Sequence, residues 1–112
     1  MSCIFCQIVN KEVPSDLIYE DDELIAFRDI QPQAPVHFLV LPRKHIPSLA
    51  EMKDEDFHIV GDMARVAVEL ARKEGVADAF RTVMNCGEDG GQTVWHVHMH
   101  VLGGRKLKDL LG

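Results

Sequence analysis

Residues 93–104, TVWHVHMHVLGG, place three of the chain's six histidines at alternate positions: His96, His98 and His100. In a β-strand, alternate side chains share one face of the sheet, so the three imidazoles are expected to point the same way. The unperturbed pKa of histidine is near 6.5, and the neutral ring is a nucleophile at neutral pH. This spacing suggests covalent chemistry at the middle imidazole, with a helper on each side.

Three interpretations of this face compete. It could be the polar outer surface of a sheet, or a metal site, or a nucleophilic His98 with two supporting histidines. A metal site is awkward because the outer two residues of such a strand diverge to about 13 Å. The preceding loop, NCGEDGGQT (residues 85–93), favours the nucleophile. Its three glycines permit close backbone approach, and a loop of this kind can hold phosphate oxygens.

The elements that must position these residues can be read from periodicity and turn residues. Apolar residues at helical spacing predict a long helix over residues 55–74. Residue types that favour turns, such as glycine, proline and aspartate, separate the expected strands. The expected set is a short helical segment at 4–10, two strands within 16–30 with a turn at Asp21-Asp22, a central strand at 36–42, the long helix, and strands at 80–85 and 93–102. We therefore expect one α+β domain, residues 1–112, with a mostly antiparallel sheet.

Composition excludes several classes of function. The formal net charge is −6, which argues against binding a polynucleotide, because that requires a basic surface. No run of about 18 apolar residues is present, so no membrane association is expected. The N-terminal residues lack the pattern of a signal peptide, and three cysteines imply no disulfide framework. A cytoplasmic protein with reduced thiols is the expectation.

The segment HVHMHVL, residues 96–102, matches the histidine triad pattern, in which three histidines alternate with apolar residues. Two longer blocks, AFRDIQPQAPVHFLVLPRKHI (26–46) and MNCGEDGGQTVWHVHMHVLGGR (84–105), resemble family blocks in the same order. CIFCQIV (3–9) and IYEDDELIAF (18–27) extend the similarity over nearly the whole chain. The chain therefore resembles the Hint branch of the histidine triad (HIT) family.

This resemblance implies a HIT fold: five antiparallel strands with one long and one short helix, dimerising into a ten-stranded sheet. A homodimer would also help a chain of this size, which by itself buries only roughly two-thirds of its unfolded surface. The implied reaction is hydrolysis of a purine nucleoside phosphoramidate, such as AMP linked to an amine, through a nucleotidyl-histidine intermediate. That chemistry implies no cofactor.

Carried over by position, the resemblance makes His98 the nucleophile, with Nδ1–H held by a backbone carbonyl and Nε2 free. His100 would stabilise the phosphate, and His96 and His37 would complete the imidazole network. Asp29 would accept hydrogen bonds from both ribose hydroxyls. The other implied contacts are Asn85, Gln92 and Thr93 to the phosphate or leaving group, and Phe5, Ile8, Phe27 and Ile30 to the base. Thr93 stands where serine is common, and the C-terminal tail that influences substrate preference in the family reads RKLKDLLG here.

Cys3 and Cys6 form a CxxC pair, which alone is weak evidence for a metal. Some relatives of the family bind structural zinc with such a pair and two histidines. The matching histidines in this chain are His45 and His96, which would complete a closed tetrahedral set of two sulfurs and two nitrogens. The resemblance therefore predicts a structural zinc ion, and free thiols are the alternative.

Two further functions stay open on sequence alone. The chain could be a dimeric sensor or scaffold that binds purine nucleotides and turns them over only incidentally. It could also be a metal-binding protein whose triad holds the ion. The rate of phosphoramidate hydrolysis distinguishes a sensor or scaffold from an enzyme. Loss of bound metal on substitution of His98 would identify a metal-binding protein.

Overall fold

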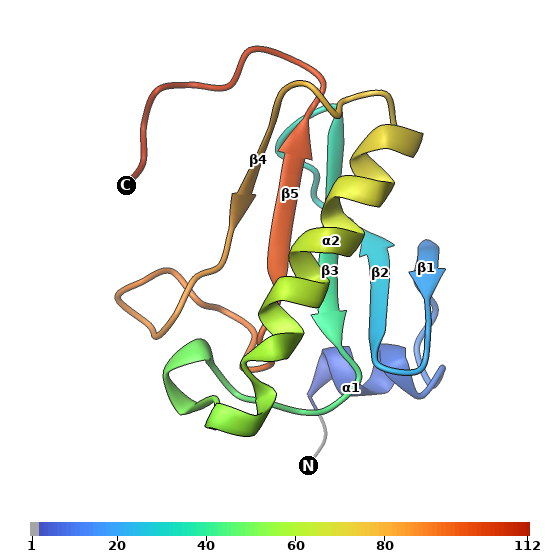
Figure 1. The fold of residues 1–112 in the computed structure, drawn as a ribbon, viewed down its shortest axis with the longest axis vertical. Coiled ribbons are helices and arrows are strands. Elements are labelled where there is room, and N and C mark those ends of the chain that lie inside the picture. The colour runs from blue at the N-terminus through green and yellow to red at the C-terminus, as the bar shows by residue number, and fades with distance from the viewer. Residues whose placement is uncertain (1–2) are drawn as a thin grey trace.

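A five-stranded antiparallel sheet forms the frame of the protein (Figure 1). In this computed structural model, which describes residues 3–112, the spatial order of the strands is β1-β2-β3-β5-β4. The strands are β1 (Leu17–Glu20), β2 (Leu24–Arg28), β3 (Val36–Pro42), β4 (Phe80–Val83) and β5 (Met99–Gly103). Every neighbouring pair is antiparallel, so the α+β class and the antiparallel sheet expected from the sequence are confirmed.

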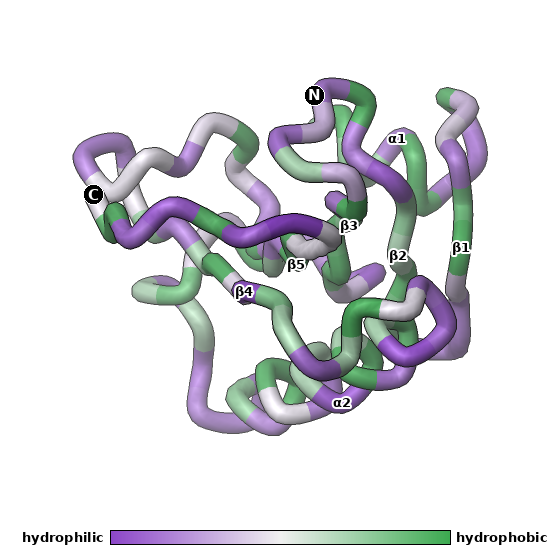
Figure 2. The backbone as a smooth tube through the Cα atoms, turned by 90° about the horizontal axis from the view of Figure 1, so that it is seen from above, coloured by the Kyte–Doolittle hydropathy of each residue, from purple (hydrophilic) through white to green (hydrophobic). Residues whose placement is uncertain are grey.

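The two helices lie on opposite faces of the sheet. The long helix α2 (His58–Lys73) covers one face, and the short helix α1 (Ile4–Val9) lies on the other, as the view from above shows (Figure 2). Two 3-10 turns, Leu49–Glu51 and Asp54–Asp56, lead from β3 into α2. Among residues 3–112, no helix is both long enough and apolar enough to cross a membrane.

Alternation along the strands explains why both faces are covered. In the central strand β3, Phe38 and Val40 belong to the core cluster beneath α2, whereas Leu39 and Leu41 belong to the cluster that includes α1. Because side chains alternate across a strand, an almost entirely apolar strand needs a partner on each side. Helix α2 is large enough to close its face, but the six residues of α1 leave part of the other face open.

The triad segment joins the sheet later than the sequence predicted. A strand was expected over residues 93–102, but β5 starts at Met99. On one side β4 ends at Val83, which pairs with His100, and on the other the ladder with β3 ends at the Val40–Met99 pair. Before that point the backbone N–H of Val97 donates to the carbonyl of Ile46, at 2.7 Å, instead of extending the sheet.

Helix α2 also differs from expectation in the extent of its buried face. The helical spacing of apolar residues predicted burial along a row beginning at Phe57, and Met63, Ala67 and Leu70 are indeed buried. Phe57, however, is 47% exposed, and Ala64, seven positions later on the same side of the helix, is also exposed. The apolar stripe of α2 is therefore wider than its own sheet covers.

Candidate active site

His98 has a defined tautomer because its ring is tied to the backbone. Its Nδ1 lies 2.8 Å from the carbonyl oxygen of His96, so Nδ1–H donates to that oxygen. A carbonyl can only accept a hydrogen bond, which leaves Nε2 of the neutral ring without a proton. The side chain is buried, and it lines a pocket on the α1 face of the sheet.

A second chain of hydrogen bonds sets the tautomers of His37 and His100. The backbone N–H of Gln33 donates to Nδ1 of His37 at 3.0 Å, so the proton of His37 is on Nε2. That Nε2 lies 2.9 Å from Nδ1 of His100, which must accept. The remaining nitrogen of His100, Nε2, therefore carries a proton and is a donor.

The imidazoles of this site are neutral at neutral pH. Burial is the main cause in each case, because it disfavours the charged ring. It lowers the pKa of His100 to about 4, with a further decrease from His98 and His37. Burial also lowers the pKa of His98 and of His37, although Asp29 opposes the change in both. A neutral His98 with a bare Nε2 is the form that can attack an electrophile.

The pocket has a volume of about 380 Å³, the size of a small-molecule site. The polar residues that line it are Ser15, Arg28, Asp29, Gln31, Thr93, His98 and His100. The rest is largely apolar. The lining residues are Ile4, Phe5, Ile8, Val13, Pro14, Ser15, Phe27, Arg28, Asp29, Ile30, Gln31, Leu39, Thr93, Val94, His98 and His100.

Phe5 of α1 connects the apolar wall to His98. Its ring meets His98 edge-on, with centroids 5.0 Å apart at 88°, and meets Phe27 in a similar way at 5.5 Å and 74°. Phe5, Ile8 and Phe27 are buried in the smaller core cluster and also line the pocket, so they serve both packing and the site. Ile30, in contrast, stands at the rim with 92% of its surface exposed.

Asp29 lies at the junction of the histidines and the apolar wall. Its Oδ1 accepts the backbone N–H of Gln31 at 2.8 Å, and its Oδ2 lies 3.4 Å from Nε2 of His37. The side chain is 19% exposed, so the carboxylate is accessible from the pocket. A carboxylate accepts hydrogen bonds, so Asp29 offers an acceptor at the pocket.

The glycine-rich loop is built differently from the expected phosphate cradle. The backbone N–H groups of Gly90, Gly91 and Gln92 donate to carbonyls inside the loop, at 3.0–3.1 Å, so they are not free to hold phosphate oxygens. Gly87 and Gly91 have φ of 80° and 93°, a conformation that favours glycine. The glycines are needed for the shape of the turn.

Gln92 and Asn85, which the sequence predicted to contact the phosphate or the leaving group, are bonded to the loop and are not among the residues that line the pocket. The buried amide of Gln92 donates to the carbonyls of Pro47 (2.7 Å) and Val94 (3.0 Å) and accepts from Gly87 N–H (2.9 Å). Asn85 contacts the loop through the carbonyl of Gly91, at 3.4 Å. Gln92 thus anchors the loop that presents Thr93.

His96 serves a separate cluster. Its ring is fully buried, Nε2–H donates to the carbonyl of Pro42 at 2.7 Å, and Nδ1 faces Cys3, Cys6 and His45. The sulfur–nitrogen distances within this cluster are 3.3–3.6 Å, and the two Nδ1 atoms are 3.4 Å apart. Within residues 3–112, no group of potential metal ligands combines two triad histidines. His96 and His100 instead belong to different groups, so the structure offers no support for an ion held by the triad itself.

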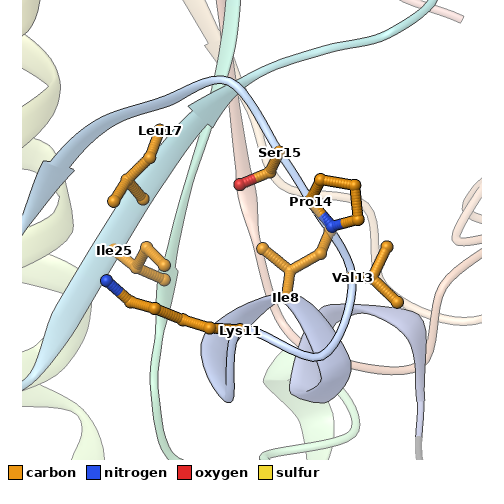
Figure 3. A pocket seen from close by; sticks show the side chains of 7 residues that line it. All are labelled: Ile8, Lys11, Val13, Pro14, Ser15, Leu17 and Ile25. Atoms are coloured by element: carbon orange, nitrogen blue, oxygen red, sulfur yellow. The ribbon is translucent and has the colours of Figure 1, made fainter.

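A smaller pocket of about 200 Å³ adjoins the first (Figure 3). It lies between the end of α1 and strands β1 and β2, and its lining residues are Ile8, Lys11, Val13, Pro14, Ser15, Leu17 and Ile25. Residues 13–15 line both pockets and form the wall between them. The ammonium group of Lys11 is paired with Glu20 at 3.3 Å, so the small pocket has an apolar interior and a charged rim.

Comparison with known proteins agrees with this geometry. A family profile described as HIT domain matches residues 10–107, most of the chain. The chain belongs to the HIT family. A protein of Escherichia coli (strain K12) named purine nucleoside phosphoramidase is 47% identical over 109 residues, which span 96% of this chain and 92% of that protein.

Solved HIT structures superpose on the whole fold. A histidine triad protein from Clostridium difficile has a TM-score of 0.94 at 46% identity, covering 99% of this chain and 97% of its own. A HIT family hydrolase from Legionella pneumophila Philadelphia 1 has a TM-score of 0.93 at 40% identity, covering 96% and 97%. The five-stranded HIT fold predicted from the sequence is thus confirmed.

Several residues of the HIT pocket were missed by sequence reasoning. Leu39 could have been found, because it lies two positions after His37 on the same strand and so shares its face. Val13, Pro14 and Ser15 belong to an irregular connection between α1 and β1, and no periodicity marks such a segment. Only the fold brings this connection to the pocket.

The buried amide of Gln92 generates a stability prediction. Gln92→Leu keeps much of the volume but leaves two carbonyls and one N–H without their partners, and each unsatisfied buried group costs about 1–3 kcal/mol. We expect the free energy of unfolding, measured by denaturant titration, to fall by at least about 3 kcal/mol. Thr93→Val, at the exposed neighbour, should change it by less than about 0.5 kcal/mol. Equal stability of the two variants would contradict the anchoring role.

Proposed function

We propose that this HIT protein hydrolyses purine nucleoside phosphoramidates through a nucleotidyl-histidine intermediate on His98. The observation that carries the proposal is the bond from His98 Nδ1–H to the carbonyl of His96, at 2.8 Å. It leaves Nε2 as the unprotonated atom of a neutral side chain that lines the pocket. The 47% identity to a purine nucleoside phosphoramidase over nearly the full length supports the same substrate class.

In the first step, Nε2 of His98 attacks the α-phosphorus and an N–P bond forms. The P–N bond to the leaving group breaks, its electron pair stays on nitrogen, and the nitrogen takes up a proton from solvent and leaves as an amine. Water then attacks phosphorus and gives a proton back to solvent, the bond to His98 breaks, and AMP and the neutral imidazole are released. Dividing one difficult hydrolysis into two displacements is the advantage of a covalent nucleophile.

His100 is suited to stabilise the phosphoryl group in both steps. Its Nδ1 accepts from His37, so its Nε2–H is left to donate to a non-bridging oxygen as charge increases in the transition state. The hydroxyl of Thr93, also at the pocket, is a second donor for the phosphate or the leaving group. Gln92 and Asn85 contribute by shaping the loop before Thr93.

The nucleoside would occupy the rest of the pocket. Asp29 offers carboxylate oxygens to the two ribose hydroxyls, and hydrogen bonds to a charged acceptor are worth about 1.5–3 kcal/mol each. The purine would lie against Phe5, Ile8, Phe27 and the exposed Ile30, where its faces would be removed from water. The charge of −6 is consistent with a single small phosphate ligand.

A zinc ion is the second part of the proposal. Tetrahedral zinc with bonds near 2.3 Å to sulfur and near 2.0–2.1 Å to nitrogen requires S···N separations of about 3.5–3.6 Å and an N···N separation of about 3.3–3.4 Å. The cluster of Cys3, Cys6, His45 and His96 has 3.3–3.6 Å and 3.4 Å. The bond from His96 Nε2–H to Pro42 leaves Nδ1 free to ligate. All four positions would be filled, so the ion would be structural.

The third part is a homodimer joined through β4 and α2. Strand β1, at one edge of the sheet, is irregular and carries charged Glu20 paired with Lys11, features that discourage pairing. Strand β4 pairs only with β5, so its other edge is available to a second copy. The exposed Phe57, which precedes α2 as its N-cap, and the exposed Ala64 on α2 supply apolar surface for such a contact. A cytoplasmic location accompanies the proposal, because zinc binding needs Cys3 and Cys6 reduced.

The experiment that tests the activity is hydrolysis of an adenosine phosphoramidate with release of AMP. We expect His98→Ala to lower kcat by at least about a thousandfold while AMP still binds, because the covalent route is lost. Mass spectrometry of the quenched wild-type reaction should detect a nucleotidyl adduct that the variant lacks. A variant that keeps more than about a tenth of the rate would refute covalent catalysis at His98.

The same assay distinguishes the nucleophile from the nucleoside contact. Asp29→Asn should raise KM at least about tenfold for a ribonucleoside substrate, and have little effect on a substrate lacking both ribose hydroxyls. Tight AMP binding without measurable turnover by the wild-type protein would instead favour the sensor or scaffold alternative.

Zinc is tested by metal analysis of protein purified without a chelator or a histidine tag. We expect close to one zinc per chain in the wild type and in Cys86→Ser, and none in the double variant Cys3→Ser, Cys6→Ser. Loss of the ion should lower the melting temperature more than it lowers the rate per folded molecule. Equal zinc in wild type and double variant, or none in either, would show that these residues are not a metal site.

The dimer is tested by sedimentation at micromolar concentration. Ala64→Glu brings two like charges together across a two-fold contact, which costs several kcal/mol, so the dimer dissociation constant should rise at least about a hundredfold. Arg65→Glu, the adjacent exposed position on another side of α2, should leave the dimer intact. A monomeric wild type, or equal effects of the two variants, would sink the proposed interface.

A further inference from the structure

The loop of residues 29–35 reaches the histidines through a backbone group. It carries Asp29 at one end, and in its middle the N–H of Gln33 donates to Nδ1 of His37 at 3.0 Å. The side chain of Gln33 takes no part in that contact, so the position of the loop backbone decides whether the donor is present. The groups that contact the His37 ring are this N–H, Nδ1 of His100 at 2.9 Å and Oδ2 of Asp29 at 3.4 Å.

The segment that follows β5 holds this loop from outside. Nη2 of Arg105 donates to the carbonyl oxygen of Gln33 at 2.9 Å. Gln33 is therefore bonded on both sides, through its N–H to His37 and through its carbonyl to Arg105. The other terminal nitrogen, Nη1, donates to the carbonyl of Lys106 at 3.0 Å, which restricts the guanidinium itself. Arg105 thus acts on the loop backbone, and it does not line the pocket.

Gly104 makes this grip possible. Its φ is +96°, and a Cβ added there would lie 2.9 Å from Cβ of Pro35, closer than real side chains approach. The chain can therefore turn back over the 29–35 loop only with glycine at this position. Val36, the first residue of β3, pairs with Gly103, the last residue of β5. The turn at Gly104 and the 29–35 loop therefore meet at the same end of the sheet.

We propose that Gly104 and Arg105 form a clamp that positions the 29–35 loop and thereby fixes the direction of the His37–His100 hydrogen bond. The inference rests on the proposed function for its catalytic consequence. Arg105 is a positioning residue. It holds the backbone of Gln33, whose N–H donates to His37, and His37 in turn donates to His100.

The direction of that bond decides what His100 presents to the phosphate. With the Gln33 N–H in place, His37 carries its proton on Nε2, and His100 Nε2–H is a donor. Without it, His37 is free to hold the proton on Nδ1, and its bare Nε2 then faces Nδ1 of His100. The pair regains a hydrogen bond only if His100 moves its own proton to Nδ1. Its Nε2 would then present a lone pair to an anionic phosphoryl group, which is repulsive.

The test uses two variants that loosen the clamp through different atoms. Arg105→Ala removes the donor to the Gln33 carbonyl, and Gly104→Ala pushes the turn away from Pro35. Arg43→Ala is the matched control, since Arg43 Nε donates to the carbonyl of Asp21 at 2.7 Å in the turn between β1 and β2. Each protein is labelled with 15N at its histidines, and its melting temperature is measured so that only folded protein is compared.

In the wild type we expect an unprotonated 15N shift at Nδ1 of His37 and a protonated shift at its Nε2. Both clamp variants should move these shifts toward the average of the two tautomers, and Arg43→Ala should not. In the phosphoramidate assay, the clamp variants should lower kcat about fivefold, which corresponds to roughly 1 kcal/mol, with KM within about twofold.

Unchanged His37 shifts in both clamp variants, or a wild-type His37 protonated at Nδ1, would overturn the clamp. The 15N measurement needs no substrate. A wild type without phosphoramidase activity would therefore refute the proposed function and still leave the clamp to be judged by its tautomer.

Discussion

The hydrogen bond from His98 Nδ1–H to the carbonyl of His96 is the interaction on which the site depends. Its acceptor is the backbone carbonyl of His96, which in a regular strand would bond to the neighbouring strand. The hydrogen-bonded ladder of β5 begins only at Met99. The two residues that the hydrogen bond joins serve different centres. His98 lines the pocket, while His96 is directed into the cluster with Cys3, Cys6 and His45. One short irregular segment thus connects the pocket to the cluster of cysteines and histidines.

Burial gives these imidazoles their chemical character. A ring removed from water resists protonation, and the pKa of His96 and of His100 falls to about 4 mainly for that reason. Neutral rings have one donor and one acceptor each, so a row of them needs a defined proton order to be satisfied. Backbone groups impose that order at both ends: the carbonyl of His96 on His98, and the N–H of Gln33 on His37. Across residues 3–112, every buried side-chain nitrogen and oxygen has a partner.

The unequal size of the two helices creates the space for a ligand. Helix α2 covers its face of the sheet along 16 residues, whereas α1 has six and covers only part of the other face. Phe5 and Ile8 attach α1 to the sheet, and Cys6, on the same helix, belongs to the cluster with His45 and His96. An ion there would hold α1 in place over His98, so the proposed zinc would support the pocket without entering it.

Much of this protein could be derived from the sequence because the signals are local. Alternation within residues 96–102 put Val97, Met99 and Val101 on the core side, and they do pack beneath α2. Turn residues located the short connections, and apolar spacing located both helices to within a few residues. The resemblance to the HIT family assembled Cys3, Cys6, His45 and His96 as one set, and the fold brings their ligand atoms within 4.8 Å of one another.

Tertiary structure decided what depends on contacts between distant segments. The sequence predicted that the glycine-rich loop and Gln92 contact phosphate, and only the fold shows that the N–H groups of residues 90–92 donate within the loop and that the Gln92 amide donates to Pro47 and Val94. It could not indicate that residues 13–15 form a pocket wall, or that Arg105 grips the carbonyl of Gln33, 72 positions away. The types and spacing of the residues show which hydrogen-bond donors and acceptors the chain contains. Which donor meets which acceptor is settled only when the folded chain removes water and leaves each group one partner within reach.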